Sequence, residues 1–67
     1  MSVARVTEIS ATSSQSFEDA VRQGIERATK TLRGVTAAWI KEQRVKIENG
    51  NISEYQVNML ITFVLTE

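Results

Sequence analysis

Hydrophobic and polar residues alternate along the last quarter of the chain. Within residues 51–66, the odd-numbered positions carry a series of bulky apolar side chains: Tyr55, Val57, Met59, Ile61, Phe63 and Leu65. Because successive side chains of a β-strand point to opposite faces, this pattern predicts a strand whose odd face packs on a core. Residues 37–48 form a second candidate strand, and Asn49 and Gly50 lie between the two. Asn-Gly is the strongest signal for a two-residue turn, so we expect a long β-hairpin.

The middle of the chain has the pattern of an amphipathic helix. Small or apolar residues recur there at helical spacing: Phe17, Ala20, Val21, Gly24, Ile25, Ala28 and Leu32. Ser16 is a favourable N-cap, and the acidic Glu18 and Asp19 suit the positive end of the helix dipole. Gly34 stands where a helix commonly ends, at the C′ position. The pattern predicts a helix over residues 16–33.

Gly24 is unusual on the apolar stripe of this helix. A glycine inside a helix is less favourable than alanine by up to about 1 kcal/mol, so its presence needs a reason. Tight packing of the helix against the sheet is the interpretation we favour. Close approach of another chain or of a ligand is the alternative.

The beginning of the chain predicts a third strand. Residues 3–9 are rich in β-branched types, and the polar run at 10–16 predicts a loop. The order is therefore strand, helix, strand, strand. A helical crossover makes the first two strands parallel, and the hairpin makes the last antiparallel to its neighbour. With the last strand in the centre, the chain is a split β-α-β unit of the α+β class, a single domain over residues 1–67 with one three-stranded antiparallel sheet wrapped on one helix.

The predicted elements do not cover one another. An 18-residue helix spans about 27 Å, whereas a 16-residue strand spans about 53 Å. The even face of the last strand also carries apolar residues, among them Ile52, Leu60 and Val64. Uncovered strand edges and apolar patches favour association. We therefore expect a homo-oligomer.

The composition supports this expectation and excludes several classes of site. The chain has 67 residues and contains no cysteine and no histidine. Disulfides, thiolate or imidazole metal sites and Ser-His or Cys-His catalysis are therefore excluded. A domain of this size buries only about 60% of its surface as a monomer, and domains of this kind usually need stapling or oligomerisation.

Charge and hydropathy exclude further functions. Eight basic residues balance eight acidic ones without a basic stripe, which argues against nucleic-acid binding. No segment approaches the ~20 apolar residues of a membrane helix, and the first residues lack the apolar core of a signal peptide, so we expect a cytoplasmic protein without a membrane partner. No phosphate loop or nucleophile motif is present, and we expect no catalytic residues.

The hairpin register predicts a polar and aromatic face. If Asn49 and Gly50 form a two-residue turn, residues 43 and 56 are opposite each other, as are 39 and 60. Trp39, Lys41, Gln43 and Val45 then share a face with Gln56, Asn58 and Leu60, away from the helix. A large aromatic beside hydrogen-bonding amides suits a planar heteroaromatic ligand. The alternative is that Trp39 fills an oligomer interface, where tryptophan is enriched.

The whole chain resembles the dodecin family of small flavin-binding proteins. The resemblance rests on the opening strand and the A-T-S after it, on Ser16-Phe17-Glu18-Asp19-Ala20, on Ala28 with Thr31-Leu32-Arg33, and on E-Y-Q-V at 54–57 leading to Phe63. Such a resemblance implies a β-α-β-β protomer assembled into a hollow homo-dodecamer. It also implies a non-enzymatic role in which flavins are bound between protomers, stored and sequestered.

The resemblance also implies ligand contacts. Gln56 matches the glutamine that hydrogen-bonds the pyrimidine edge of the flavin. The family's stacking tryptophan would fall near Ala37, so Trp39 stands about two positions later, on the same face and roughly 7 Å along the strand. We expect Trp39 to stack on riboflavin, FMN or FAD and Gln56 to orient it. Lys41, Gln43 and Arg44 are weaker candidates for contacts to the ribityl or phosphate tail.

Two other functions fit the same assembly. In the first, the shell binds no flavin and Trp39 is buried between copies. In the second, the particle stores a cation such as calcium, as some relatives without the tryptophan do, with oxygen ligands that the sequence does not identify.

Overall fold

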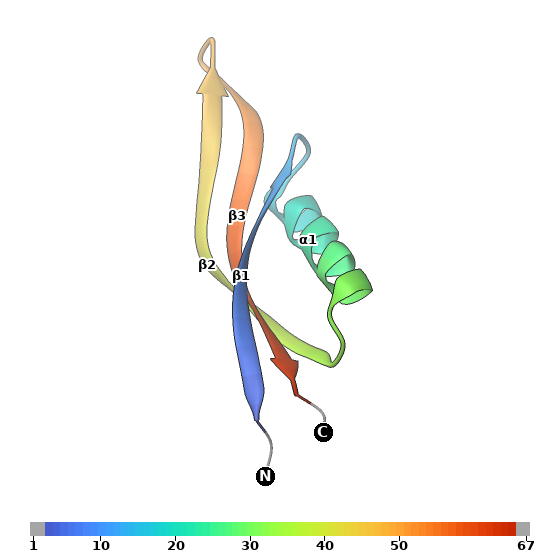
Figure 1. The fold of residues 1–67 in the computed structure, drawn as a ribbon. Helices are drawn as coiled ribbons and strands as arrows, with labels where there is room; N and C mark the ends of the chain where they lie inside the picture. Colours follow the sequence, from blue (N-terminus) through green and yellow to red (C-terminus); the bar gives the residue numbers. More distant parts are fainter. Residues whose placement is uncertain (1–2, 66–67) are drawn as a thin grey trace.

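The computed structural model describes residues 3–65 and has the predicted element order (Figure 1). Strand β1 covers Ala4–Ser13, helix α1 covers Phe17–Thr31, and strands β2 and β3 cover Val35–Glu48 and Asn51–Val64. The sheet order is β1-β3-β2, and β3 pairs antiparallel with both neighbours. The predicted α+β class and the central position of the last strand are therefore confirmed.

Strand β1 extends four residues further than the sequence predicts. The polar residues from Ser10 to Ser13 belong to the strand and not to the loop, because each pairs with a residue of β3, ending with Ser13 opposite Tyr55. Only residues 14–16 connect this strand to the helix. At the other end of the chain, Thr66 of the predicted last strand lies outside the described residues.

Both ends of α1 are held by local contacts. The Ser16 hydroxyl accepts a hydrogen bond from the Asp19 backbone N–H at 3.0 Å, which confirms the predicted N-cap. The helix ends two residues earlier than predicted, with Leu32 as the C-cap, so Gly34 is one position beyond the expected C′ site. Gly34 still needs its flexibility, because its φ is +75° and an added Cβ would lie 2.8 Å from the carbonyl oxygen of Val64.

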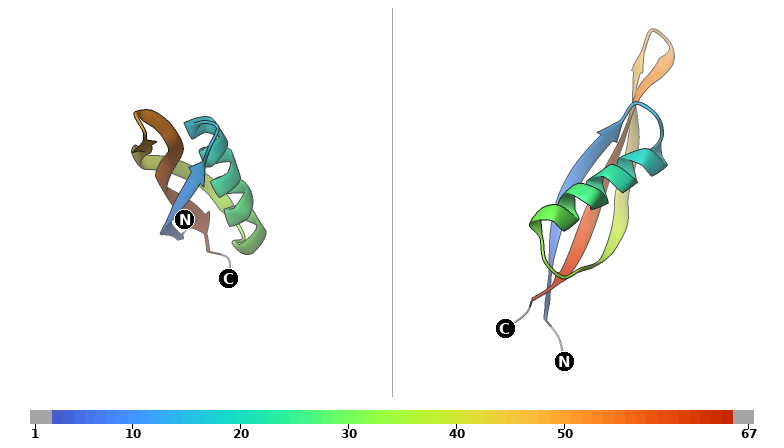
Figure 2. Two further views of the ribbon diagram at one scale, coloured as in Figure 1. Left: turned by 90° about the horizontal axis from the view of Figure 1, so that it is seen from above. Right: turned by 90° about the vertical axis from the view of Figure 1, so that its right-hand side faces the viewer.

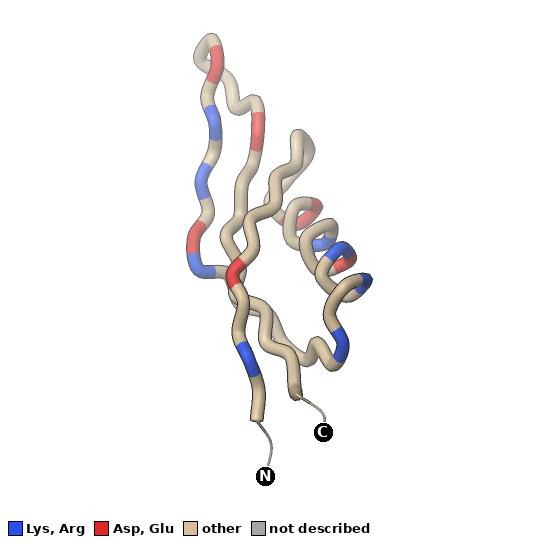
Figure 3. The backbone as a smooth tube through the Cα atoms, in the orientation of Figure 1, with Lys and Arg blue, Asp and Glu red and all other residues tan. Residues whose placement is uncertain are grey.

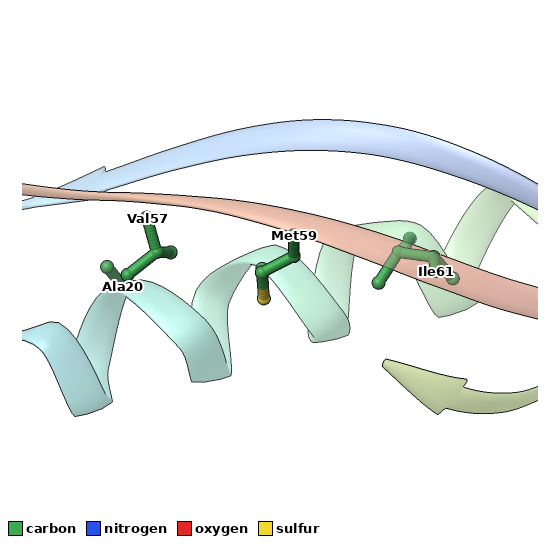
Figure 4. Close-up of a cluster of buried hydrophobic side chains, with 5 residues drawn as sticks. Ala20, Val57, Met59 and Ile61 are labelled. Carbon is green, nitrogen blue, oxygen red and sulfur yellow. The ribbon is translucent and has the colours of Figure 1, made fainter. Parts of the chain in front are cut away.

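The core lies between α1 and the odd face of β3. Val57, Met59 and Ile61 are fully buried and point toward the helix, where Ala20 is also buried (Figure 4). The predicted core face of the last strand is therefore confirmed. Gly24 lies against this face, since an added Cβ would meet the Met59 side chain and lie 3.1 Å from Ala11 Cβ. Tight helix–sheet packing explains the glycine.

Much of the chain lies beyond the reach of the helix. Figure 2 shows α1 on one side of the sheet, with the tip of the β2–β3 hairpin extending past it. The accessible area is 5078 Å², against about 4,200 Å² for a compact monomer of this mass. The radius of gyration is 13.9 Å, against about 11 Å for a compact chain of this length. Several large apolar side chains are exposed: Val3, Val6, Trp39, Ile40, Ile47, Ile52 and Leu65.

Candidate functional site

The face of the sheet opposite α1 carries the predicted ligand residues. Trp39 on β2 pairs with Leu60 on β3, as the sequence predicts, and the tryptophan is 48% exposed. Leu60 has even parity in β3, whereas the buried core residues have odd parity. Trp39 therefore lies on the face away from the helix, which we call the outward face. Gln56, also of even parity, lies on the same face.

The turn that was expected to set the register is present. Asn49 and Gly50 both have positive φ, at 52° and 77°, and Glu48 pairs with Asn51. These values agree with the type I′ turn that Asn-Gly favours. The pairing is not uniform beyond the turn, however, because β2 has three register shifts.

Two of these shifts lie on either side of Gln43 and change its predicted face. Counted from the turn, the first lies between Ile47, which is opposite Ile52, and Lys46, which is opposite Glu54, so that Ser53 has no partner on β2. Between Ile40 and Glu42 the register moves by one residue, so that Lys41 has no partner on β3. Beyond this β-bulge, Arg44 is opposite Gln56, and Gln43 is opposite the buried Val57. Val45 is likewise opposite Tyr55, so the prediction that Gln43 and Val45 share the face of Gln56 is wrong. A bulge inserts one extra residue and exchanges the parity of all that follow.

The bulge keeps the basic residues on the outward face. Lys41 Nζ lies 3.4 Å from a carboxylate oxygen of Glu8, which is opposite Leu60 on β1. Arg44 joins Gln56 by strand pairing. Of the five predicted ligand residues, Trp39, Lys41, Arg44 and Gln56 thus share this face. Basic and acidic residues follow one another along β2 and form no single block of charge (Figure 3).

Gln56 is the centre of a polar network that sequence reasoning did not find. Its amide nitrogen donates to Ser10 Oγ at 2.8 Å and approaches Asn58 Oδ1 at 3.5 Å. Asn58 in turn donates from Nδ2 to a carboxylate oxygen of Glu42 at 2.9 Å. The two-residue spacing of Gln56 and Asn58 was visible in the sequence. The contribution of Ser10 was not, because it depends on the pairing of β1 with β3.

Two hollows in the surface bear on ligand binding. One of about 210 Å³ lies beside the hairpin and includes both Arg44 and Gln56 in its lining. A larger hollow of about 540 Å³ lies between β1 and α1, and none of the five predicted residues lines it. Of the two hollows, only the smaller is lined by predicted ligand residues.

A metal site and a membrane helix each have requirements that can be compared with the part of the chain that the structure describes. Residues 3–65 contain no cluster of three or more carboxylates that could hold a metal ion. The one helix in this part of the chain, α1, has 15 residues and is not suited to crossing a membrane. Within the same range, every buried polar side-chain atom has a hydrogen-bond partner.

Comparison with known proteins places this fold in one class. The family model for dodecin matches residues 3–66. Dodecin of Thermus thermophilus is 35% identical over 65 residues, which cover 97% of this chain and 94% of that protein. The crystallised dodecin of Streptomyces coelicolor is 35% identical, with a TM-score of 0.93 over 98% of this chain and 94% of its own.

A more distant relative is described as binding calcium. The calcium dodecin of Mycobacterium tuberculosis, described as a calcium-chelating antigen with a novel calcium-binding site, is 27% identical. Its TM-score is 0.83 over 97% of this chain and 93% of its own. The match to the family model and the relatives above 30% identity agree with the β-α-β-β topology and the β1-β3-β2 sheet described above. The chain belongs to the dodecin family.

Proposed function

We propose that this protein is a non-enzymatic flavin-binding protein that stores and sequesters riboflavin, FMN or FAD in the cytoplasm. The observation that supports this most is the outward face, where the exposed indole of Trp39 and the amide of Gln56 lie on neighbouring strands of one sheet. An indole offers area for stacking, and an amide orients a heteroaromatic edge. Lys41 and Arg44 on the same face supply positive charge for a phosphate-bearing tail.

The same face supports binding between copies of the chain. Trp39 is opposite Leu60, four residues from Gln56, which is about 13 Å along the strand. A flavin stacked on the indole therefore leaves much of its own surface to be covered by other residues. A second copy would supply that cover and bury the exposed Trp39 and Val6 of this face at the same time. We propose a homo-oligomer, with the twelve copies that the family resemblance implies.

Titration of riboflavin or FMN into the purified protein tests the ligand. We expect flavin fluorescence to be quenched at micromolar protein, and Trp39→Ala to weaken binding at least tenfold. Gln56→Ala and Gln43→Ala form a matched pair, since they remove the same amide from opposite faces. Only Gln56→Ala is expected to weaken binding. Unchanged flavin fluorescence with the unmodified protein would refute the proposal.

The mass in solution tests the assembly separately. Twelve copies of the 7.5 kDa chain would weigh about 90 kDa. A 7.5 kDa species in light scattering would contradict the oligomer. A large particle that is colourless and leaves flavin fluorescence unchanged would instead favour the alternative in which the shell binds no flavin, and elemental analysis would then show whether it holds calcium.

A further inference from the structure

A continuous chain of side-chain hydrogen bonds crosses the outward face from β2 to β1. It begins at the Glu42 carboxylate, which accepts from Asn58 Nδ2 at 2.9 Å. It continues from Asn58 Oδ1 to Gln56 Nε2 at 3.5 Å, and from Gln56 Nε2 to Ser10 Oγ at 2.8 Å. All three strands of the sheet contribute to it. Its order has a direction, because Asn58 donates to Glu42 and accepts from Gln56, whereas Gln56 donates to both Asn58 and Ser10.

The carboxylate at one end determines that direction. An ionised carboxylate only accepts hydrogen bonds, so the Asn58 amide must present its NH₂ group to Glu42 and its oxygen to Gln56. The Gln56 amide must then present its NH₂ group to Asn58, since the opposite orientation would place two acceptor oxygens against each other. The Ser10 hydroxyl either donates or accepts and so adapts to the result.

One atom of Gln56 is left available. Both hydrogens of its NH₂ group are directed into the network, one toward Ser10 and one toward Asn58. Among residues 3–65, no side chain or backbone group donates to Gln56 Oε1. The outward face therefore offers an oriented acceptor at this position, beside the hollow that Arg44 also lines.

We propose that Glu42 and Asn58 are positioning residues that fix Gln56 as a hydrogen-bond acceptor, and that the site thereby selects planar ligands with an imide N–H on their edge. The inference rests on the proposed flavin binding and specifies it. In the flavin ring system the group that fits is the N3–H of the pyrimidine portion, which lies between two carbonyl groups. A ring with only acceptors on that edge would place its lone pairs against Gln56 Oε1.

The contribution of this network is to selectivity and not to fold stability. Glu42 and Ser10 are exposed in the single chain, and exposed hydrogen bonds contribute little net stability. An acceptor held in one orientation discriminates strongly, however, because a ligand without the matching N–H leaves it unpaired. The positioning residues should therefore change the ratio of two affinities more than they change folding.

Riboflavin and 3-methylriboflavin, in which a methyl group replaces the N3 hydrogen, provide the test. We expect the unmodified protein to bind riboflavin at least tenfold more tightly. Glu42→Gln makes the end of the network either donor or acceptor, and it should reduce that ratio severalfold. Glu48→Gln is the matched control, because it removes the same charge from the far end of β2, and it should leave the ratio unchanged. Steric exclusion of the methyl group alone would be insensitive to Glu42→Gln.

The outcomes separate the two proposals. If riboflavin binds and the ratio is near one, or is unaffected by Glu42→Gln, the selectivity proposal is overturned while flavin binding stands. If neither flavin binds, the proposed function fails, and NMR of the ligand-free protein still tests the network. Glu42→Gln should then shift the side-chain NH₂ resonances of both Asn58 and Gln56. A shift confined to Asn58 would show that the orientation is not transmitted.

Discussion

The two faces of the sheet use the same strands in different ways. On the helix side, β3 contributes Val57, Met59 and Ile61, which are fully buried within one chain. On the outward side, the neighbouring positions are half-buried or exposed and carry amides, charges and Trp39. Burial of these three residues needs no partner, although Ile40 on the same face, opposite Met59, is still 41% exposed. In the described part of the chain, the second face has no such buried cluster and is covered only by a ligand or another copy. The comparison indicates that folding and binding are assigned to opposite faces.

The largest expected effect is on the helix side. Met59→Ala removes a fully buried side chain between Gly24 and the sheet, and we expect it to lower the free energy of unfolding by about 2–5 kcal/mol. Leu60→Ala, one position along on the outward face, is the matched comparison and should cost less in a single chain. Denaturant titration measures both. Equal losses would show that the two faces are not distinct in the way described.

A smaller effect is expected from filling the space above Gly24. Gly24→Val would press on Met59 and Ala11, and overpacking of this kind destabilises by about 1–3 kcal/mol. Glu26→Val places the same β-branched residue at an exposed position of the same helix and serves as the control for a buried against an exposed site. If thermal unfolding shows no difference between the two variants, the tight contact between helix and sheet is not limiting.

The smallest effect is expected on the outward face. Glu8→Gln removes the ion pair with Lys41, whose side chains are about half exposed, and such pairs contribute at most about 1 kcal/mol. Any loss should decrease further at high salt because the charges are screened. Chemical unfolding at low and high ionic strength tests this. A large, salt-independent loss would mean that this face also contributes to folding.

The features predicted correctly from the sequence are those set by neighbours along the chain. The alternation in 51–66 predicts the core face of β3, and Asn49 with Gly50 predicts the turn, because strand parity and turn conformation are local properties. Ser16 predicts the helix start for the same reason. The family resemblance then adds the expected assembly and ligand.

The features that were missed depend on partners distant in sequence. Ser10 and Ser13 look like loop residues, and they lie in a strand only because β3 is long enough to pair with them. The face of Gln43 was assigned wrongly because the register counted from the turn shifts at Ser53 and shifts back at Lys41, and neither position carries a marker such as glycine. The network around Gln56 was missed because it joins three strands whose relative register was unknown.

The bulge at Lys41 changes which residues of β2 lie on the outward face, from odd-numbered to even-numbered. Before it, the outward face takes odd-numbered residues and receives Trp39; after it, that face takes even-numbered residues and receives Glu42 and Arg44. One strand can therefore present an aromatic segment and a charged segment on the same side, although a regular strand with this sequence would divide them between two sides. Inserting one residue between Glu42 and Gln43 would place Arg44 against the core and Gln43 on the outward face, whereas deleting Lys41 would only remove the bulge. The spacing of this chain is thus as much a part of the site as the side chains themselves.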